Sequence, residues 1–191
     1  MRCLSCQGWS LSVICRRCHE SLLRPTVSTR RIGMMDVVSL YRYRTVAPFL
    51  LSKHTPRGYR IYRYFGRRQV APFLEAFAEG VEGPTLLLSI DERLSGGYAH
   101  TSLLAHGSRF ELLRPLHGAL VARNPVRYTG RSLQYRLTHP REFVYRGPEG
   151  VPAVLLDDVV TTGTTLSEAR ALLAKHGVEV LFALTLADAK E

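Results

Sequence analysis

The chain has 191 residues, 46% of them hydrophobic, which is enough for one ordinary core and a small additional module. No apolar run approaches the ~20 residues that a membrane-spanning helix needs, and the N-terminal residues include cysteines and arginines where a signal peptide would be apolar. We therefore expect a cytoplasmic protein, and peripheral contact with a membrane surface is compatible with the sequence.

The formal net charge of +10 is unevenly distributed. Residues 1–146 contain 23 Lys and Arg against 9 Asp and Glu, whereas residues 147–191 contain 3 against 7. Arginine outnumbers lysine 23 to 3, which favours planar contacts with phosphate and stacking on bases. A polyanionic partner is one interpretation of this excess. A genome-wide arginine preference with a solvated surface is the other.

Two Cys-x-x-Cys pairs, Cys3 with Cys6 and Cys15 with Cys18, contain all four cysteines of the chain. Each pair can supply two thiolates to a tetrahedral Zn²⁺, and the eight residues between the pairs can close a small loop. Because disulfides are rare in a reducing cytosol, a structural zinc site is the leading interpretation, and unligated thiols are the alternative. We expect residues 1–24 to form this zinc module, since so short a segment cannot build a stable hydrophobic core and needs a cross-link such as a bound metal ion.

The elements expected after this module are those of an α/β domain. Residues 25–35 predict a polar linker, and residues 36–191 the domain itself. Alternating apolar and polar side chains at 36–44 predict a strand with Arg42 and Arg44 on its exposed face. Residues 45–80 predict two helices interrupted near residues 55–58, because apolar residues recur there with helical spacing. The apolar run at 84–90 predicts a buried strand, and residues 98–106 predict a helix.

The remaining chain divides into an irregular and a regular part. Residues 114–150 are rich in Arg, Gly, Pro and Tyr with weak periodicity, so we expect irregular structure there. A buried strand at 151–158, an amphipathic helix at 166–176 and a second buried strand at 178–186 follow. This βαβ unit predicts a mostly parallel sheet flanked by helices, and therefore an α/β fold.

The strand at 151–158 ends in two acids, and a loop of small hydroxyl-bearing residues follows it. A phosphate binds where several backbone N–H groups converge at the start of a helix, and a glycine permits close approach. Thr165 and Glu168 fit a capping box, which predicts that the helix begins at Thr165. The adjacent carboxylates of Asp157 and Asp158 suit two vicinal ribose hydroxyls, and a carboxylate beside a phosphate also suits Mg²⁺.

Two other interpretations of this segment compete. Its acidic strand end is similar to that of P-loop NTPases, but the chain lacks the Gly-x-x-x-x-Gly-Lys-Ser/Thr sequence that holds a triphosphate. Alternatively, the segment merely turns the chain and caps a helix.

The 12 residues from Val154 to Thr165 (VLLDDVVTTGTT) resemble the phosphoribosyl diphosphate (PRPP) motif of type I phosphoribosyltransferases. The resemblance implies the type I phosphoribosyltransferase fold, with the ribose hydroxyls bound by Asp157 and Asp158 and with Mg²⁺ accompanying the diphosphate. It assigns the 5-phosphate to Thr161, Thr162, Gly163, Thr164 and Thr165.

A four-cysteine module before a PRPP motif, in a basic chain of this size, resembles the ComF-type competence family of phosphoribosyltransferase-like proteins. The resemblance implies handling of single-stranded DNA during uptake in natural transformation, binding of PRPP or a similar phosphoribosyl compound, and contact with DNA-uptake proteins at the inner face of the membrane. In the middle of the chain, Gly97 and Tyr98 match the family's loop, whereas Gly96, Ala99 and His100 depart from it. These departures leave transfer chemistry open.

Interleaved tyrosines and arginines between residues 41 and 68 suggest where single-stranded DNA would bind, since bases stack on aromatic rings while guanidinium groups contact phosphates. The candidate arginines are Arg42, Arg44, Arg60, Arg63, Arg67 and Arg68. Half-buried tyrosines with a structural role explain the pattern equally well. Two further functions compete with DNA handling: a Mg²⁺-dependent phosphoribosyltransferase with an unidentified acceptor, and a PRPP or nucleotide sensor whose zinc module docks a protein partner.

Overall fold

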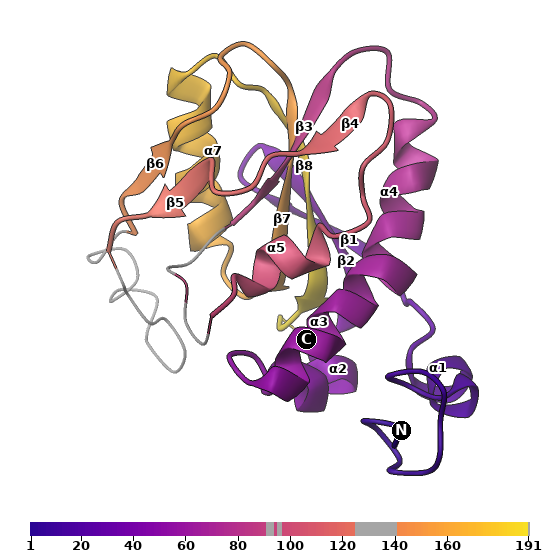
Figure 1. Cartoon of the computed structure of the whole chain (residues 1–191). Coiled ribbons are helices and arrows are strands. Elements are labelled where there is room, and N and C mark those ends of the chain that lie inside the picture. The colour runs from indigo at the N-terminus through magenta and orange to yellow at the C-terminus, as the bar shows by residue number, and fades with distance from the viewer. Residues whose placement is uncertain (91–93, 95–96, 125–140, 191) are drawn as a thin grey trace.

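The computed structural model describes residues 1–90, 94, 97–124 and 141–190. A six-stranded sheet with the order β1-β2-β8-β7-β3-β4 forms its centre (Figure 1). The strands are β1 (Ser28–Ile32), β2 (Met35–Arg42), β3 (Thr85–Ser89), β4 (Leu113–Pro115), β7 (Ala153–Val160) and β8 (Val180–Asp188). Every neighbouring pair is parallel except β1 with β2. The predicted fold class, an α/β fold with a mostly parallel sheet, is confirmed.

Helices cover both faces of this sheet (Figure 1). One face carries α2 (Tyr43–Leu50), α3 (Pro56–Phe65), the π-helix η1 (Gly66–Val70), α4 (Ala71–Ala78) and α5 (His100–Leu104). The other face carries α7 (Thr164–Lys175) and a hairpin of β5 (Leu120–Ala122) and β6 (Phe143–Tyr145). In the part of the chain described, no helix combines the length and apolar character needed to cross a membrane.

The strand β7 shows why the sequence builds two cores. Its side chains alternate between the faces, so Val154 and Leu156 join the core under α2–α5, whereas Ala153 and Leu155 join the core under α7. A strand buried on both faces needs a continuous apolar run, which the sequence supplies up to Leu156.

Two predicted boundaries near the N-terminus are wrong. The strand predicted at 36–44 ends at Arg42, and Arg44 lies in α2, so the two arginines do not share a strand face. The helix starts early because Val46, Phe49 and Leu50 have helical spacing and pack into the core. The segment predicted as a linker, residues 25–35, contains β1, whose polar side chains are tolerated because it is an edge strand.

The segment predicted as irregular, residues 114–150, also contains regular structure. It includes most of β4 and the antiparallel pair β5–β6, whose Leu120, Ala122, Phe143 and Tyr145 are buried. Three-residue strands are too short to give a clear alternation in the sequence. Residues 125–140 of this segment lie outside the described residues.

The connections that leave β3 and β7 diverge, although these strands are neighbours in the sheet. The chain leaves β3 through α5 on one face and leaves β7 through α7 on the other. In open α/β sheets, a ligand binds outside the carboxyl ends of two neighbouring strands whose following connections run to opposite faces of the sheet. The fold therefore places a candidate ligand site at the end of β7.

Candidate functional site

The two acids of the motif lie in the C-terminal half of strand β7, with their side chains on opposite faces of the sheet. Asp157 is half-buried, and its Oδ1 accepts a hydrogen bond of 2.8 Å from the backbone N–H of Asp158. Asp158 is buried, with only 5% of its surface exposed, beneath the helices α2–α5. Neighbours in the sequence therefore occupy different environments.

The carboxylate of Asp158 is held by three side chains from other segments. Its Oδ2 accepts from Tyr62 Oη at 2.9 Å and from Lys53 Nζ at 3.2 Å, and His100 Nε2 lies 3.4 Å away. Burial raises the pKa of Asp158, but the charges of His100 and Lys53 and the hydrogen bond from Tyr62 outweigh it and lower the pKa to about 2. Asp158 is therefore ionised at neutral pH.

The ring of His100 is fixed between two other rings. It meets Tyr62 and His54 edge to face, with centroids 5.4 Å apart in both cases. His100 is also one of the positions where the chain departs from the ComF-type loop, so this departure contributes directly to the surroundings of Asp158. Sequence reasoning missed the roles of Lys53, Tyr62 and His100, because no sequence pattern links these residues to Asp158. One signal was available: a buried carboxylate needs a cation, and Lys53 is the only lysine before residue 175.

The loop after β7 turns on Gly163, which precedes α7 with a φ of +82°. A side chain there would be strained in this left-handed conformation and would collide with Ile32 of β1. The helix begins at Thr164, so the predicted capping box with a start at Thr165 is wrong. Glu168, the other residue of that box, instead accepts hydrogen bonds from the backbone N–H groups of residues 141 and 142, at 3.1 and 2.7 Å.

Hydroxyl groups and an arginine define the rest of this loop. The side-chain oxygens of Thr162 and Thr164 lie 2.9 Å apart, and Thr162 is exposed. Arg30 of β1 donates to the Thr161 carbonyl oxygen and to the carboxylate of Asp188, at 2.5 Å each. The loop is thereby tied to β1 and β8 and opens onto the first turn of a 12-residue helix. Backbone N–H groups and a positive helix end in this arrangement can bind a phosphate.

The structure brings all four cysteines together, as the sequence predicts. The four Sγ atoms of Cys3, Cys6, Cys15 and Cys18 lie within 4.8 Å of one another. Backbone N–H groups of Cys15 and Ser5 donate to Cys3 Sγ at 3.2 and 3.4 Å, an arrangement that favours a thiolate.

The charge distribution in this cluster suits a cation. Burial raises the pKa of Cys3, but hydrogen bonds from the backbone of Cys15, Cys6 and Ser5 lower it to about 6. A side-chain hydrogen bond with Ser5 lowers the pKa of Cys18, yet burial and the three neighbouring sulfurs raise it to about 11. A thiolate at Cys3 therefore disfavours a second thiolate at Cys18, because the two negative charges repel each other. A divalent cation bound between the sulfurs would remove this repulsion. The cluster is compatible with zinc binding.

The cysteine module, residues 1–24 with helix α1 (Arg16–Leu22), lies beside α3 (Figure 1). Arg57 of α3 donates to the carbonyl oxygen of Leu4, and His19 Nδ1 lies 2.6 Å from Tyr64 Oη. The module is thus attached to the helix that also supplies Tyr62 to the acid site.

The six candidate DNA-binding arginines have different surroundings. Arg42 and Arg44 are exposed at the junction of β2 and α2. On α3, Arg60 Nη2 lies 3.3 Å from Met1 Sδ, toward the cysteine module. In η1, Arg67 Nη2 lies 3.3 Å from His106 Nε2, beyond the end of α5. The remaining two are Arg63, which is half-buried, and Arg68, which is exposed.

The tyrosines interleaved with these arginines also differ in exposure. Tyr41 and Tyr62 are fully buried, so for these two the structural role applies. Tyr59, at 39% exposure, keeps an accessible ring.

No protein-family model matches the chain, and no curated protein matches it. Among solved structures, two crystal forms of a hypoxanthine phosphoribosyltransferase from Staphylococcus aureus, tetragonal and orthorhombic, are similar, with TM-scores of 0.40 and 0.39. Each is 18% identical, over 66% of this chain and 62% of that enzyme. The match therefore spans less than two thirds of the enzyme's length.

Proposed function

We propose that the protein binds a 5-phosphoribosyl compound, with PRPP as the candidate ligand, in the manner of type I phosphoribosyltransferases. The strongest support is the position of the acid pair and the Thr161–Thr165 loop, which lie together at the carboxyl end of β7 where the connections of β3 and β7 diverge. Of the acid pair, Asp157 would accept from the ribose hydroxyls, since Asp158 Oδ2 already accepts from Tyr62 and Lys53, and the 5-phosphate would lie in the loop at the start of α7.

Mg²⁺ would enter this site with the diphosphate of PRPP and neutralise part of its charge. Asp158 fits poorly as a direct ligand, because its Oδ2 already accepts from Tyr62 and Lys53. Asp157 is the carboxylate of the pair that suits an oxygen-coordinated cation.

Removal of two loop hydroxyls should weaken PRPP binding. In the Thr162→Ala/Thr164→Ala protein we expect the dissociation constant for PRPP with Mg²⁺ to rise about 10–100-fold, since hydrogen bonds to a charged group contribute about 1.5–3 kcal/mol. Isothermal titration calorimetry measures the change. The matched control is Ser167→Ala, an exposed hydroxyl one turn further along α7. Equal affinities in all three proteins would refute phosphate binding by the loop.

Phosphoribosyl transfer to an unidentified acceptor is the alternative function for the same residues. Asp157 and Asp158 would position the sugar while the loop anchors the phosphate, and the site would stabilise a cationic ribosyl transition state. Pyrophosphate release from PRPP with a panel of bases and amines would establish transfer. PRPP binding without release across the panel would favour a binding protein.

As a second function we propose the handling of single-stranded DNA that the ComF-type resemblance implies, in the cytoplasm and beside DNA-uptake proteins at the inner face of the membrane. The uneven charge supports it, with 23 basic residues against 9 acidic ones before residue 147. Exposed Arg42, Arg44, Arg60 and Arg68 supply cationic groups for phosphates.

Binding of an oligothymidylate should weaken steeply with salt. Each phosphate contact contributes a slope of about −0.7 to log K against log salt for single strands, so Arg60→Gln/Arg68→Gln should make the slope shallower by about 1.4. Fluorescence anisotropy across a salt series measures this, with exposed Arg146→Gln as the control. A flat, weak salt dependence in the unmodified protein would exclude DNA handling.

We also propose that the cysteine cluster binds one structural Zn²⁺ through Cys3, Cys6, Cys15 and Cys18, which together complete a tetrahedral shell. Four protein ligands leave no position for a reacting water, so zinc would stabilise the module and take no part in catalysis.

A further inference from the structure

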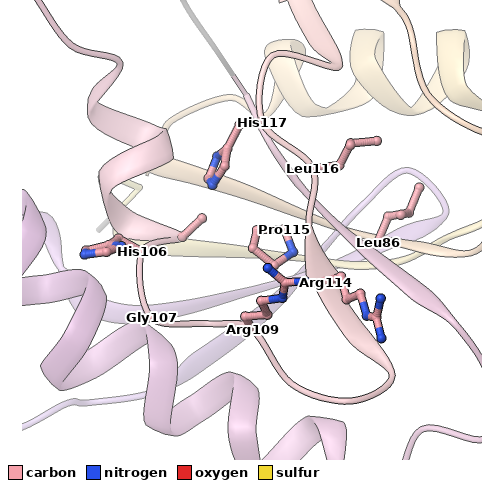
Figure 2. Close-up of a pocket in the computed structure, with 9 residues that line it drawn as sticks. Leu86, His106, Gly107, Arg109, Arg114, Pro115, Leu116 and His117 are labelled. Carbon is pink, nitrogen blue, oxygen red and sulfur yellow. The ribbon is translucent and has the colours of Figure 1, made fainter.

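A hollow beside the edge strand β4 belongs to neither of the sites described above (Figure 2). Its volume is about 480 Å³, within the range of about 300–1,000 Å³ that small-molecule sites occupy. Its lining includes two arginines and two histidines: His106, Arg109, Arg114 and His117. Leu86, Pro115 and Leu116 supply apolar surface. Arg109 extends toward Pro115, and the ring of His117 approaches from the opposite side (Figure 2).

A second hollow of about 280 Å³ continues the first, because both include His106 and His117. Its far end is formed by Tyr59 of α3 and by Tyr98, whose rings meet edge to face with centroids 5.6 Å apart. The Tyr98 hydroxyl donates to the Thr55 carbonyl oxygen at 3.0 Å, which holds this ring in place. Aromatic side chains therefore adjoin the arginines and histidines of the first hollow.

The positive charge around the two hollows is not neutralised locally. Among the residues that the structure describes, no carboxylate forms an ion pair with Arg63, Arg67 or Arg109. Within that same set, Arg63 Nε is buried without a hydrogen-bond partner. Burial lowers the pKa of His106, and the charges of Arg63, Arg67 and His117 lower it further. The guanidinium groups of Arg109 and Arg114 line the first hollow, and that of Arg67 lies 3.3 Å from His106 Nε2, so an anion entering this space would be favoured.

We propose that these joined hollows form a second ligand site, which binds a nucleoside 5′-monophosphate. The phosphate lies against Arg109 and His117, where planar guanidinium and imidazole N–H groups donate to its oxygens. The sugar covers the apolar surface of Pro115 and Leu116, and the base packs on Tyr59 and Tyr98. The site is separate from the phosphoribosyl site, because its lining comes from α3, β3, α5, β4 and the connections beside α5 and β4, and it includes no residue of β7 or its loop.

Equilibrium dialysis with radiolabelled AMP tests the proposal. AMP also carries a 5-phosphoribosyl group, so we expect two molecules per chain in the unmodified protein. Arg109→Gln/His117→Gln should raise the dissociation constant of the second site about 10–100-fold, which leaves one AMP per chain. The loop variant Thr162→Ala/Thr164→Ala should also bind one, and the protein with all four substitutions none. Arg146→Gln should retain both.

These variants separate the two sites. Arg109 and His117 are exposed, so their replacement leaves the core intact, which circular dichroism verifies. If the loop variant binds no AMP and the Arg109→Gln/His117→Gln protein binds as much as the unmodified protein, the second site does not exist. If the Arg109→Gln/His117→Gln protein binds no AMP and the loop variant is unaffected, the second site stands and the phosphoribosyl proposal fails. Adenosine without phosphate should not compete with AMP at the second site. An oligothymidylate that binds there more tightly than AMP would overturn the mononucleotide as its ligand.

Discussion

Replacement of Asp158 by alanine should destabilise the protein by about 3–5 kcal/mol, the usual cost of removing one partner from a buried ion pair. The substitution leaves Lys53 Nζ and His100, which is only 2% exposed, without the carboxylate they share. It also removes the acceptor for the hydroxyl of the buried Tyr62. Urea denaturation at pH 7 measures the loss as a lower midpoint.

The neighbouring acid is the matched control for this prediction. Asp157→Ala should change the free energy of unfolding by only about 1 kcal/mol, because Asp157 is half-buried and not enclosed by the core as Asp158 is. It should nevertheless abolish PRPP binding. Equal losses of stability in the two variants would contradict the division of roles between the adjacent carboxylates.

The pH dependence identifies the cause of the Asp158 effect. Its pKa of about 2 lies below the ordinary value of about 3.9, so its ionised form stabilises the fold. That contribution is complete above about pH 4 and is lost as the pH falls toward 2. The difference in stability between the unmodified protein and Asp158→Ala should shrink over the same interval. A difference that stays constant down to pH 2 would point to lost packing instead.

Removal of zinc should unfold the cysteine module and destabilise the domain beneath it. Cys3 and Cys18 belong to the same core cluster as Leu23, and the Leu23 carbonyl oxygen accepts from Tyr41 Oη at 2.7 Å and Gln69 Nε2 at 3.1 Å. Loss of the module would leave both buried donors unpaired, at about 1–3 kcal/mol each. A loss of about 3 kcal/mol corresponds to about 6–12 °C in the melting temperature of a chain of this size.

The measurement compares Cys3→Ser with the unmodified protein by metal analysis and thermal melting. We expect one Zn²⁺ per chain in the unmodified protein and a strong reduction in the variant. Arg17→Gln, an exposed position in α1, serves as the control. A chelated protein that melts at the same temperature as the zinc-loaded one would show that the cluster has no structural role.

Patterns that depend on neighbouring residues were predictable from the sequence. The apolar run before Asp157 predicts a doubly buried strand, and the spacing of the cysteines predicts their cluster; both are present. The tight turn at Gly163 also follows from local chemistry, since a glycine tolerates the positive φ found there.

Features that depend on distant contacts were not predictable in this way. Glu168 looks like a helix cap in the sequence, yet it accepts from the backbone at residues 141 and 142, more than 20 positions earlier. Lys53 and His100 reach Asp158 from separate segments, and no local pattern marks them. The polar residues of β1 resemble a linker until their pairing with β2 is known.

The order of strands in the sheet has a consequence for synthesis on the ribosome. Strands β2 and β3 emerge early, but they are not neighbours, because β8 and β7 lie between them. Until residues 153–188 have been made, the nascent chain exposes two unpaired strand edges and the apolar faces meant for the central pair. Parallel pairing over such long sequence separations forms slowly. A chain that stalls before β7 should therefore be a substrate for chaperones and proteases, since its first 150 residues cannot close the sheet.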